Sequence, residues 1–165
     1  MSNWNSYLKE YQNYLRLERG LSPNTIQNYS FDVEKLVGFL IENNIEVTPI
    51  KITDEQVQQF IYTISTQVNA RSQSRIISGL KSFFNYLIFE DYRKDTPLEL
   101  IEVPKTGRKL PDTLSTQEID LLINAINLTS AEGERNKAML ETLYSCGLRV
   151  SELVTLKISD LFFEE

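Results

Sequence analysis

Apolar side chains recur at helical spacing through the first hundred residues, and no segment there shows the sustained alternation of a strand. The spacing predicts helices that begin near Asn3, Ser22, Thr53 and Ala70. Ser22 followed by Pro23 is a helix-start pair, and Thr53 with Gln56 forms a capping box. We therefore expect a mainly α chain in which residues 1–103 form one four-helix domain.

Residues 104–113 interrupt this pattern with structure-breaking and basic residues. The breakers are Pro104, Gly107 and Pro111, and the cations are Lys105, Arg108 and Lys109. Because proline and glycine disfavour helix continuation, the segment is predicted to be an extended linker. Its cations outnumber its acids, so the linker is also a candidate contact for phosphate groups.

Helical spacing resumes after the linker. Ser115 and Glu118 form a second capping box, and Gly147 suits the position just past a helix end, where a positive φ is needed. The predicted elements of residues 114–165 are helices near 116–127 and 135–146, a short helix at 149–156, and the approach to a strand at 158–165.

Charge is distributed unevenly along this acidic chain. The net charge of -6 argues against a nucleic-acid partner, because phosphate binding relies on clustered lysine and arginine. However, residues 56–89 contain no Asp or Glu, while Arg71, Arg75 and Lys81 lie among them. Segregated charge of this kind can present a basic face despite an acidic total.

These cations share one predicted helix with small hydroxyl side chains. The candidate DNA-binding residues of this helix are Arg71, Ser72, Ser74, Arg75, Ser78 and Lys81. Cations mixed with short hydroxyl side chains suit phosphate contact, whereas the simpler interpretation is a solvated surface. Asn24, Thr25 and Asn28 are weaker candidates, because they are also ordinary helix-start residues. Gly79, within the same helix, predicts a close approach by another segment.

Cysteine and histidine usage narrows the chemistry. The chain has one cysteine, Cys146, and no histidine, which excludes an internal disulfide and leaves no ligand set for a structural zinc site. A lone cysteine fits a reducing compartment, and we expect a cytoplasmic protein. The apolar runs are too short to span a membrane. No metal, nucleotide or other cofactor is indicated.

The run RNKAMLETLYSCGLRVSELVTL is the most specific motif of the chain. Arg149 follows the glycine break at the start of a helix, where its guanidinium and free backbone N–H groups can converge on one phosphate. The run resembles the first catalytic-arginine motif of tyrosine site-specific recombinases, nearest the bacterial Xer type. The resemblance implies that Arg149 binds the scissile phosphate and that Glu152 supports it structurally rather than by proton transfer. A helix cap or salt bridge is the simpler role for Arg149.

The order of the predicted segments also resembles this family. The resemblance implies a SAM-like core-binding domain at 1–103, an interdomain linker at 104–113 and the first helices of an incomplete catalytic domain at 114–165. Family members cleave DNA through a tyrosine, with two arginines, a lysine and histidine-type donors around the phosphate. Only Arg149 matches that set, and all 8 tyrosines precede the family's nucleophile position. We therefore expect an N-terminal portion that binds duplex DNA without cleaving it.

The partners that the resemblance implies are double-stranded DNA and other recombinase subunits, with no membrane. It leaves open the DNA site and the biological role, which is either chromosome-dimer resolution, linked to chromosome partition and cell division, or mobile-element integration. An alternative of another class is a helical protein-interaction module that does not use DNA. Salt separates the two, because phosphate binding weakens steeply as salt rises.

Overall fold

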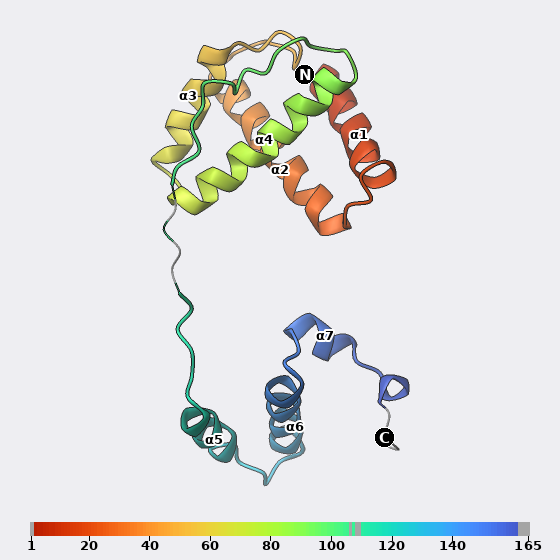
Figure 1. Cartoon of the computed structure of the whole chain (residues 1–165), viewed down its shortest axis with the longest axis vertical. Helices are drawn as coiled ribbons and strands as arrows, with labels where there is room; N and C mark the ends of the chain where they lie inside the picture. Colours follow the sequence, from red (N-terminus) through yellow and green to blue (C-terminus); the bar gives the residue numbers. More distant parts are fainter. Residues whose placement is uncertain (1, 106, 108–109, 162–165) are drawn as a thin grey trace. The chain divides into compact units, whose positions relative to one another are not determined.

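The computed structural model describes residues 2–105, 107 and 110–161, and it divides the chain into two compact units, Met1–Arg108 and Lys109–Glu165 (Figure 1). Every regular element within the described residues is a helix. The mainly α fold that the sequence predicts is therefore confirmed.

Four helices build the first unit. They are α1 (Ser2–Leu17), α2 (Pro23–Glu42), α3 (Asp54–Ser65) and α4 (Ala70–Phe89). Two starts carry the predicted caps: the Ser22 hydroxyl accepts the backbone N–H of Thr25 at 3.3 Å, and both halves of the capping box of Thr53 and Gln56 are present. Asn69, which no sequence pattern singles out, caps α4 with its side-chain oxygen. Side-chain caps thus satisfy backbone N–H groups that a helix leaves unpaired at its start.

The core of the first unit is rich in aromatic residues. Tyr11, Phe60, Phe83 and Phe84 are among its largest fully buried side chains. Tyr11 lies edge-on to Phe83, with ring centroids 5.3 Å apart, and its hydroxyl donates to Ser82 at 2.8 Å. The edge-on geometry is favourable for aromatic pairs, and the hydrogen bond satisfies the one polar atom of the buried ring.

The closest helix packing in this unit is where α2 crosses α4 (Figure 1). Gly79 of α4 is buried there, and a Cβ atom on it would lie 2.9 Å from Cβ of Asp32 and would collide with the Asp32 carboxylate. The close approach predicted at Gly79 is therefore confirmed. Asp32 itself is fully buried, so the absent side chain makes room for a carboxylate between two helices.

Arg93 fastens the chain that follows α4 to the loop between α2 and α3. Its Nη1 donates to the carbonyl oxygens of Pro49 and Ile52, each at 3.0 Å. The guanidinium also lies 5.5 Å from the ring centroid of Phe84, and the side chain is only 7% exposed. A buried arginine is thus paired with backbone acceptors and an aromatic face, as burial of a cation requires.

The second unit contains α5 (Thr116–Asn124), α6 (Ala131–Cys146), α7 (Val150–Thr155) and a single 3-10 turn, η1 (Ile158–Asp160). The strand approach predicted at 158–165 is wrong for residues 158–160, and residues 162–165 lie outside the described range. Here the Asp160 side chain accepts the Lys157 N–H at 3.0 Å, which closes the chain into a turn. The helix predicted from residue 135 begins earlier, because Ser130 caps it at the N–H of Gly133.

The helices of the second unit have no buried apolar core of their own. Among residues 110–161 only Gly133 is buried. Large apolar side chains are instead exposed, including Leu121 at 71%, Val154 at 70% and Ile158 at 84%. Local capping and short contacts therefore define these helices, whereas the first unit is also held by tertiary packing.

Replacing Gly79 by alanine should destabilise the first unit by about 1–3 kcal/mol, because the new methyl group must displace a buried carboxylate. Gly38→Ala in α2 is the matched control, since nothing lies within 4 Å of the Cβ position there. Removing a helical glycine at that open site should stabilise by about 0.5–1 kcal/mol. Urea unfolding followed by far-UV circular dichroism measures both, and a Gly79→Ala chain as stable as the parent would contradict this packing.

Candidate nucleic-acid interface

Arg149 lies at the junction of α6 and α7. The α6 helix ends at Cys146, and Gly147 takes the left-handed conformation with φ +63°. Arg149 then stands at the N-cap position of α7. Only glycine adopts this φ without strain, so the end of α6 just before Arg149 follows from the sequence itself.

Glu152 holds both the backbone and the side chain of Arg149. One carboxylate oxygen accepts the Arg149 backbone N–H at 2.6 Å, and the other accepts Nη1 of the guanidinium at 3.0 Å. Glu152 therefore caps the start of α7 and is also an ion-pair partner for the arginine. The Arg149 side chain remains 83% exposed. An exposed ion pair of this kind is weak, so an incoming anion can compete for the guanidinium.

The predicted basic helix is α4. Among the described residues, some of its candidate side chains have no partner, and others contact α2 or the chain after α4. Arg71, Ser74, Arg75 and Ser78 follow one another at helical spacing on one face. Arg71 is exposed, and no ion pair or side-chain hydrogen bond is recorded for it in the described part of the chain. The hydroxyl of Ser78 is turned to the Ser74 carbonyl at 2.9 Å, and Ser72 is half-buried at the capped helix start.

Arg75 has an intramolecular partner that the sequence did not reveal. Its Nη1 donates to Oδ2 of Asp32 at 2.9 Å, and its Nη2 lies 2.8 Å from Oδ1. The Arg75 side chain is 46% exposed, whereas Asp32 is fully buried. A signal was present: Asp32 falls within the apolar stripe of α2, three residues after Tyr29 and one before Val33. An acid in such a stripe needs a cation from a neighbouring helix.

Ser74 contacts the first residue of the linker, and Lys81 contacts the segment just before the linker. The Ser74 hydroxyl lies 3.1 Å from the Pro104 carbonyl oxygen, and Nζ of Lys81 donates to the Ile101 carbonyl at 3.3 Å. Figure 1 shows the chain after α4 turning back toward the start of that helix. These two candidates therefore hold the segment that enters the linker against α4. Lys81 still has donors for a phosphate, because a lysine carries three, whereas the single hydroxyl proton of Ser74 is directed at backbone carbonyls.

The remaining candidates lie at the start of α2 and in the linker. Asn24 and Asn28 are exposed, whereas Thr25 is half-buried with its hydroxyl 2.9 Å from that of Ser22. Thr25 thus belongs to the helix cap. Lys105 is exposed, and Arg108 and Lys109 lie outside the described residues.

Comparison with protein families places both units. Residues 8–91 match the phage integrase N-terminal SAM-like domain, and residues 112–165 match the phage integrase family. The chain belongs to the phage integrase family of tyrosine recombinases. Arg149 and Glu152 fall within the second match, and α2 and α4 fall within the first.

Named tyrosine recombinases match nearly the whole chain. The tyrosine recombinase XerD of Oceanobacillus iheyensis is 40% identical over 155 residues, which cover 93% of this chain and 52% of the relative. That of Yersinia pestis is 38% identical over 158 residues, covering 95% and 52%. A crystal structure of XerA recombinase aligns with a TM-score of 0.47 at 29% identity, covering 96% of this chain and 52% of that one. This integrase-family chain therefore spans about half the length of these relatives.

The tyrosines of this integrase-family chain are mostly core residues. Tyr11 and Tyr86 are buried, and burial raises the pKa of both phenols. A hydrogen bond to Glu10 raises the pKa of Tyr92. Tyr62 and Tyr144, at 76% and 49% exposed, are the two with open access to solvent. A raised pKa disfavours the phenolate, so the first three are poorly suited to nucleophilic attack.

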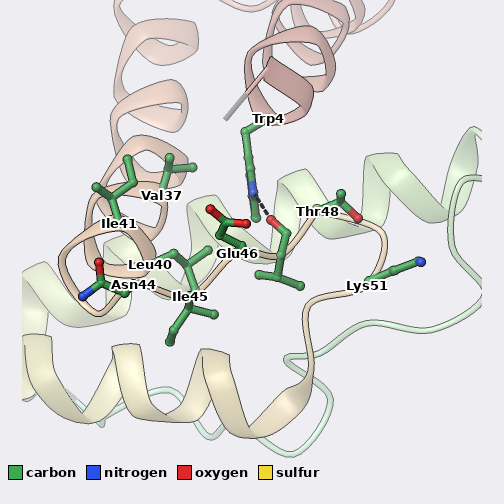
Figure 2. A pocket seen from close by; sticks show the side chains of 10 residues that line it. Trp4, Val37, Leu40, Ile41, Asn44, Ile45, Glu46, Thr48 and Lys51 are labelled. Carbon is green, nitrogen blue, oxygen red and sulfur yellow. Dashed lines mark hydrogen bonds between the residues drawn. The ribbon is translucent and has the colours of Figure 1, made fainter.

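A cleft of the first unit lies away from these residues. Its volume is about 650 Å³, and it is bordered by the start of α1, the end of α2 and the loop that follows (Figure 2). Trp4 and Val47 both line the cleft, and the Trp4 indole N–H donates to the Val47 carbonyl oxygen at 2.7 Å. None of the predicted site residues lines it, and its charged side chains are Glu46 and Lys51.

In the described part of the chain, no group of three or more cysteine or carboxylate side chains is placed to hold a metal ion. Over the same residues, none of the helices combines the length and apolar character needed to cross a bilayer.

The pH dependence of unfolding should show which effect governs Asp32. Burial raises the pKa of this carboxyl above its ordinary 3.8, while Arg75 and Lys35 act to lower it. With burial dominant, the stability contributed by the protonated form is complete below pH 3.8 and is lost as pH rises through the folded-state pKa. Relative to Asp32→Asn, which lacks this titration, the parent should therefore lose unfolding free energy from pH 4 upward.

Urea unfolding of both chains between about pH 3.5 and 7 makes the comparison. A parent that instead gains stability over Asp32→Asn as pH rises would show that the Arg75 charge outweighs burial.

Proposed function

We propose that this chain is the DNA-binding portion of a tyrosine recombinase. Residues 1–103 serve as the core-binding domain, residues 104–113 as the linker, and residues 114–165 as the opening of the catalytic domain. Family membership supports this assignment, because the two family matches fall on either side of the linker. The partners are duplex DNA and other recombinase subunits, and a DNA partner implies action in the cytoplasm.

The observation that carries the proposal is the exposed cationic surface along α4 and the linker. No acid occurs from residue 56 to residue 89, and Arg71, Arg75 and Lys105 reach solvent there and just beyond. The acids that produce the net charge of -6 all lie outside residues 56–89, so they reduce long-range attraction to DNA without adding negative charge to α4. The expected contacts are to phosphates, which position a protein on DNA without reading its sequence.

Arg149 is the second point of contact. The Arg149 guanidinium is exposed, and the Glu152 carboxylate accepts the Arg149 backbone N–H. The side chain is therefore partly ordered before a phosphate arrives. In a complete recombinase this arginine would stabilise negative charge on the scissile phosphate. Strand cleavage also needs a nucleophile in line with the leaving oxygen and further donors around the phosphate. The chain on its own therefore binds DNA without cutting it, and it needs no cofactor.

A protein-interaction module remains the second candidate, and the exposed apolar side chains of the second unit favour it. We assign those side chains instead to contact with the remainder of a catalytic domain, since the matched relatives are about twice as long. The two functions differ in their response to salt, because an apolar interface lacks the counterion release of phosphate binding.

Replacing Arg71 and Lys105 together with alanine should weaken binding to duplex DNA across different sequences. The slope of log K against log salt should flatten by roughly 0.9 for each phosphate contact removed. Lys51→Ala with Lys94→Ala is the matched control, because it removes the same charge from exposed positions outside this surface. Fluorescence anisotropy at several salt concentrations gives both quantities. Equal slopes in the two double variants would assign Arg71 and Lys105 to ordinary solvated surface.

The chain should form no covalent adduct with a nicked suicide duplex that carries its cognate site. The reason is that Arg149 is the only family catalytic residue that it matches. Denaturing gel electrophoresis detects an adduct, and the double variant Tyr62→Phe with Tyr144→Phe removes the two most accessible phenols. An adduct from the parent would refute the expectation.

In a separate binding titration, Arg149→Ala should weaken DNA binding relative to the parent by about 1–3 kcal/mol, as for one charge-assisted hydrogen bond.

A further inference from the structure

A buried carboxylate lies directly behind one of the cations on the α4 surface. Asp32 of α2 has no exposed surface. Nη1 of Arg75 donates a hydrogen bond to Oδ2 of Asp32 at 2.9 Å, and Nη2 lies 2.8 Å from Oδ1 as an ion-pair contact, although Oδ1 accepts no hydrogen bond within the described residues. Gly79 lies one turn after Arg75 on α4, and its missing side chain leaves the space that the Asp32 carboxylate occupies. The sequence thus keeps a costly buried charge and a glycine in mid-helix at the same point, which a purely apolar contact would not require.

The two-point contact fixes the orientation of the Arg75 guanidinium. A planar guanidinium with a hydrogen bond at Nη1 and an ion-pair contact at Nη2 cannot turn without lengthening one of these two contacts. The side chain is nevertheless 46% exposed. An arginine has five N–H donors, and in the described part of the chain the only partner recorded for this one is Asp32. Part of the donor edge is therefore presented to solvent in a defined direction.

We propose that Asp32 is a positioning residue for DNA binding, which holds Arg75 so that its outward donor edge meets a DNA phosphate. The proposal rests on the DNA-binding function proposed above. Arg71, four residues earlier on the same face, has no such support. A free arginine loses side-chain freedom when it binds, whereas Arg75 has already lost it on folding. Removing the support should weaken binding by roughly 2- to 10-fold, which corresponds to ordering one long side chain.

Two other roles for Asp32 give different results. If the carboxylate mainly cancels the Arg75 charge, its removal frees a cation and strengthens DNA binding. If the pair only holds α2 against α4, its removal lowers stability, and any effect on DNA binding does not depend on Arg75. Only the positioning role predicts that loss of the Asp32 carboxylate weakens DNA binding when Arg75 is present and has no effect when Arg75 is absent.

The test uses the full chain and four variants: Asp32→Asn, Arg75→Ala, the double variant of these two, and Arg75→Lys. Asp32→Asn keeps the side-chain shape, and thermal unfolding checks that each variant is folded. Arg75→Lys keeps the charge without the fork. Glu34→Gln is the matched control, because it makes the same charge change at an exposed position on α2. Anisotropy titrations with one duplex at several salt concentrations measure binding.

We expect Asp32→Asn and Arg75→Lys each to weaken binding by roughly 2- to 10-fold, and Glu34→Gln to leave it unchanged or slightly tighter. The double variant should bind within about twofold of Arg75→Ala, since Asp32 has nothing left to position. Nitrogen-15 NMR should show a slowly rotating, distinct guanidinium signal for Arg75 in the parent that moves to the free-arginine position in Asp32→Asn.

Tighter binding by Asp32→Asn would overturn the proposal in favour of charge cancellation. Additive losses in the double variant would overturn it in favour of a structural pair, as would a freely rotating Arg75 in the parent. A parent that binds no duplex at any salt concentration would remove the DNA-binding function itself, and this inference with it.

Discussion

The first unit depends on the close crossing of α2 and α4. Gly79 removes the side chain that would separate the helices, and Asp32 fills that space with a carboxylate paired to Arg75. Two further contacts lie around this crossing. Arg93, which follows α4, donates to backbone carbonyls of the loop after α2, and Lys81 of α4 donates to the Ile101 carbonyl just before the linker. Because helices pack with little free volume, the crossing sets where the exposed face of α4 lies.

Local signals predicted the elements well, while contacts between elements escaped them. Ser22, Thr53 and Ser115 cap the helices that they were expected to cap, since a cap depends only on residues three positions apart. Gly79 likewise predicted a close approach by another segment. The residue that approaches it, Asp32, did not follow from the sequence, because the pairing of Asp32 with Arg75 depends on the angle at which α2 and α4 cross. Arg93 and the linker contacts of Ser74 were missed for the same reason: their acceptors are backbone carbonyls, which every residue carries.

The second unit shows what the same local signals achieve without a core. Ser130 caps α6 and Gly147 ends it, yet apolar side chains such as Leu121 and Ile158 remain exposed. The Arg149–Glu152 contact is formed all the same, because both residues belong to one helix start. The sequence pattern predicted the approach to a strand at 158–165, and at residues 158–160 the local Lys157–Asp160 contact forms a turn instead. The contact between Arg149 and Glu152 is thus locally encoded, while the pairing of Arg75 with Asp32 is a tertiary feature.

We propose that DNA binds along α4 and at the start of α7. Chemical-shift mapping of the nitrogen-15-labelled chain with a duplex locates the binding surface residue by residue. We expect the perturbed amides to cluster at residues 70–81 and 147–153, with the linker near Lys105 also affected. Perturbations confined to the cleft beside Trp4, or spread evenly over the acidic surfaces, would contradict it.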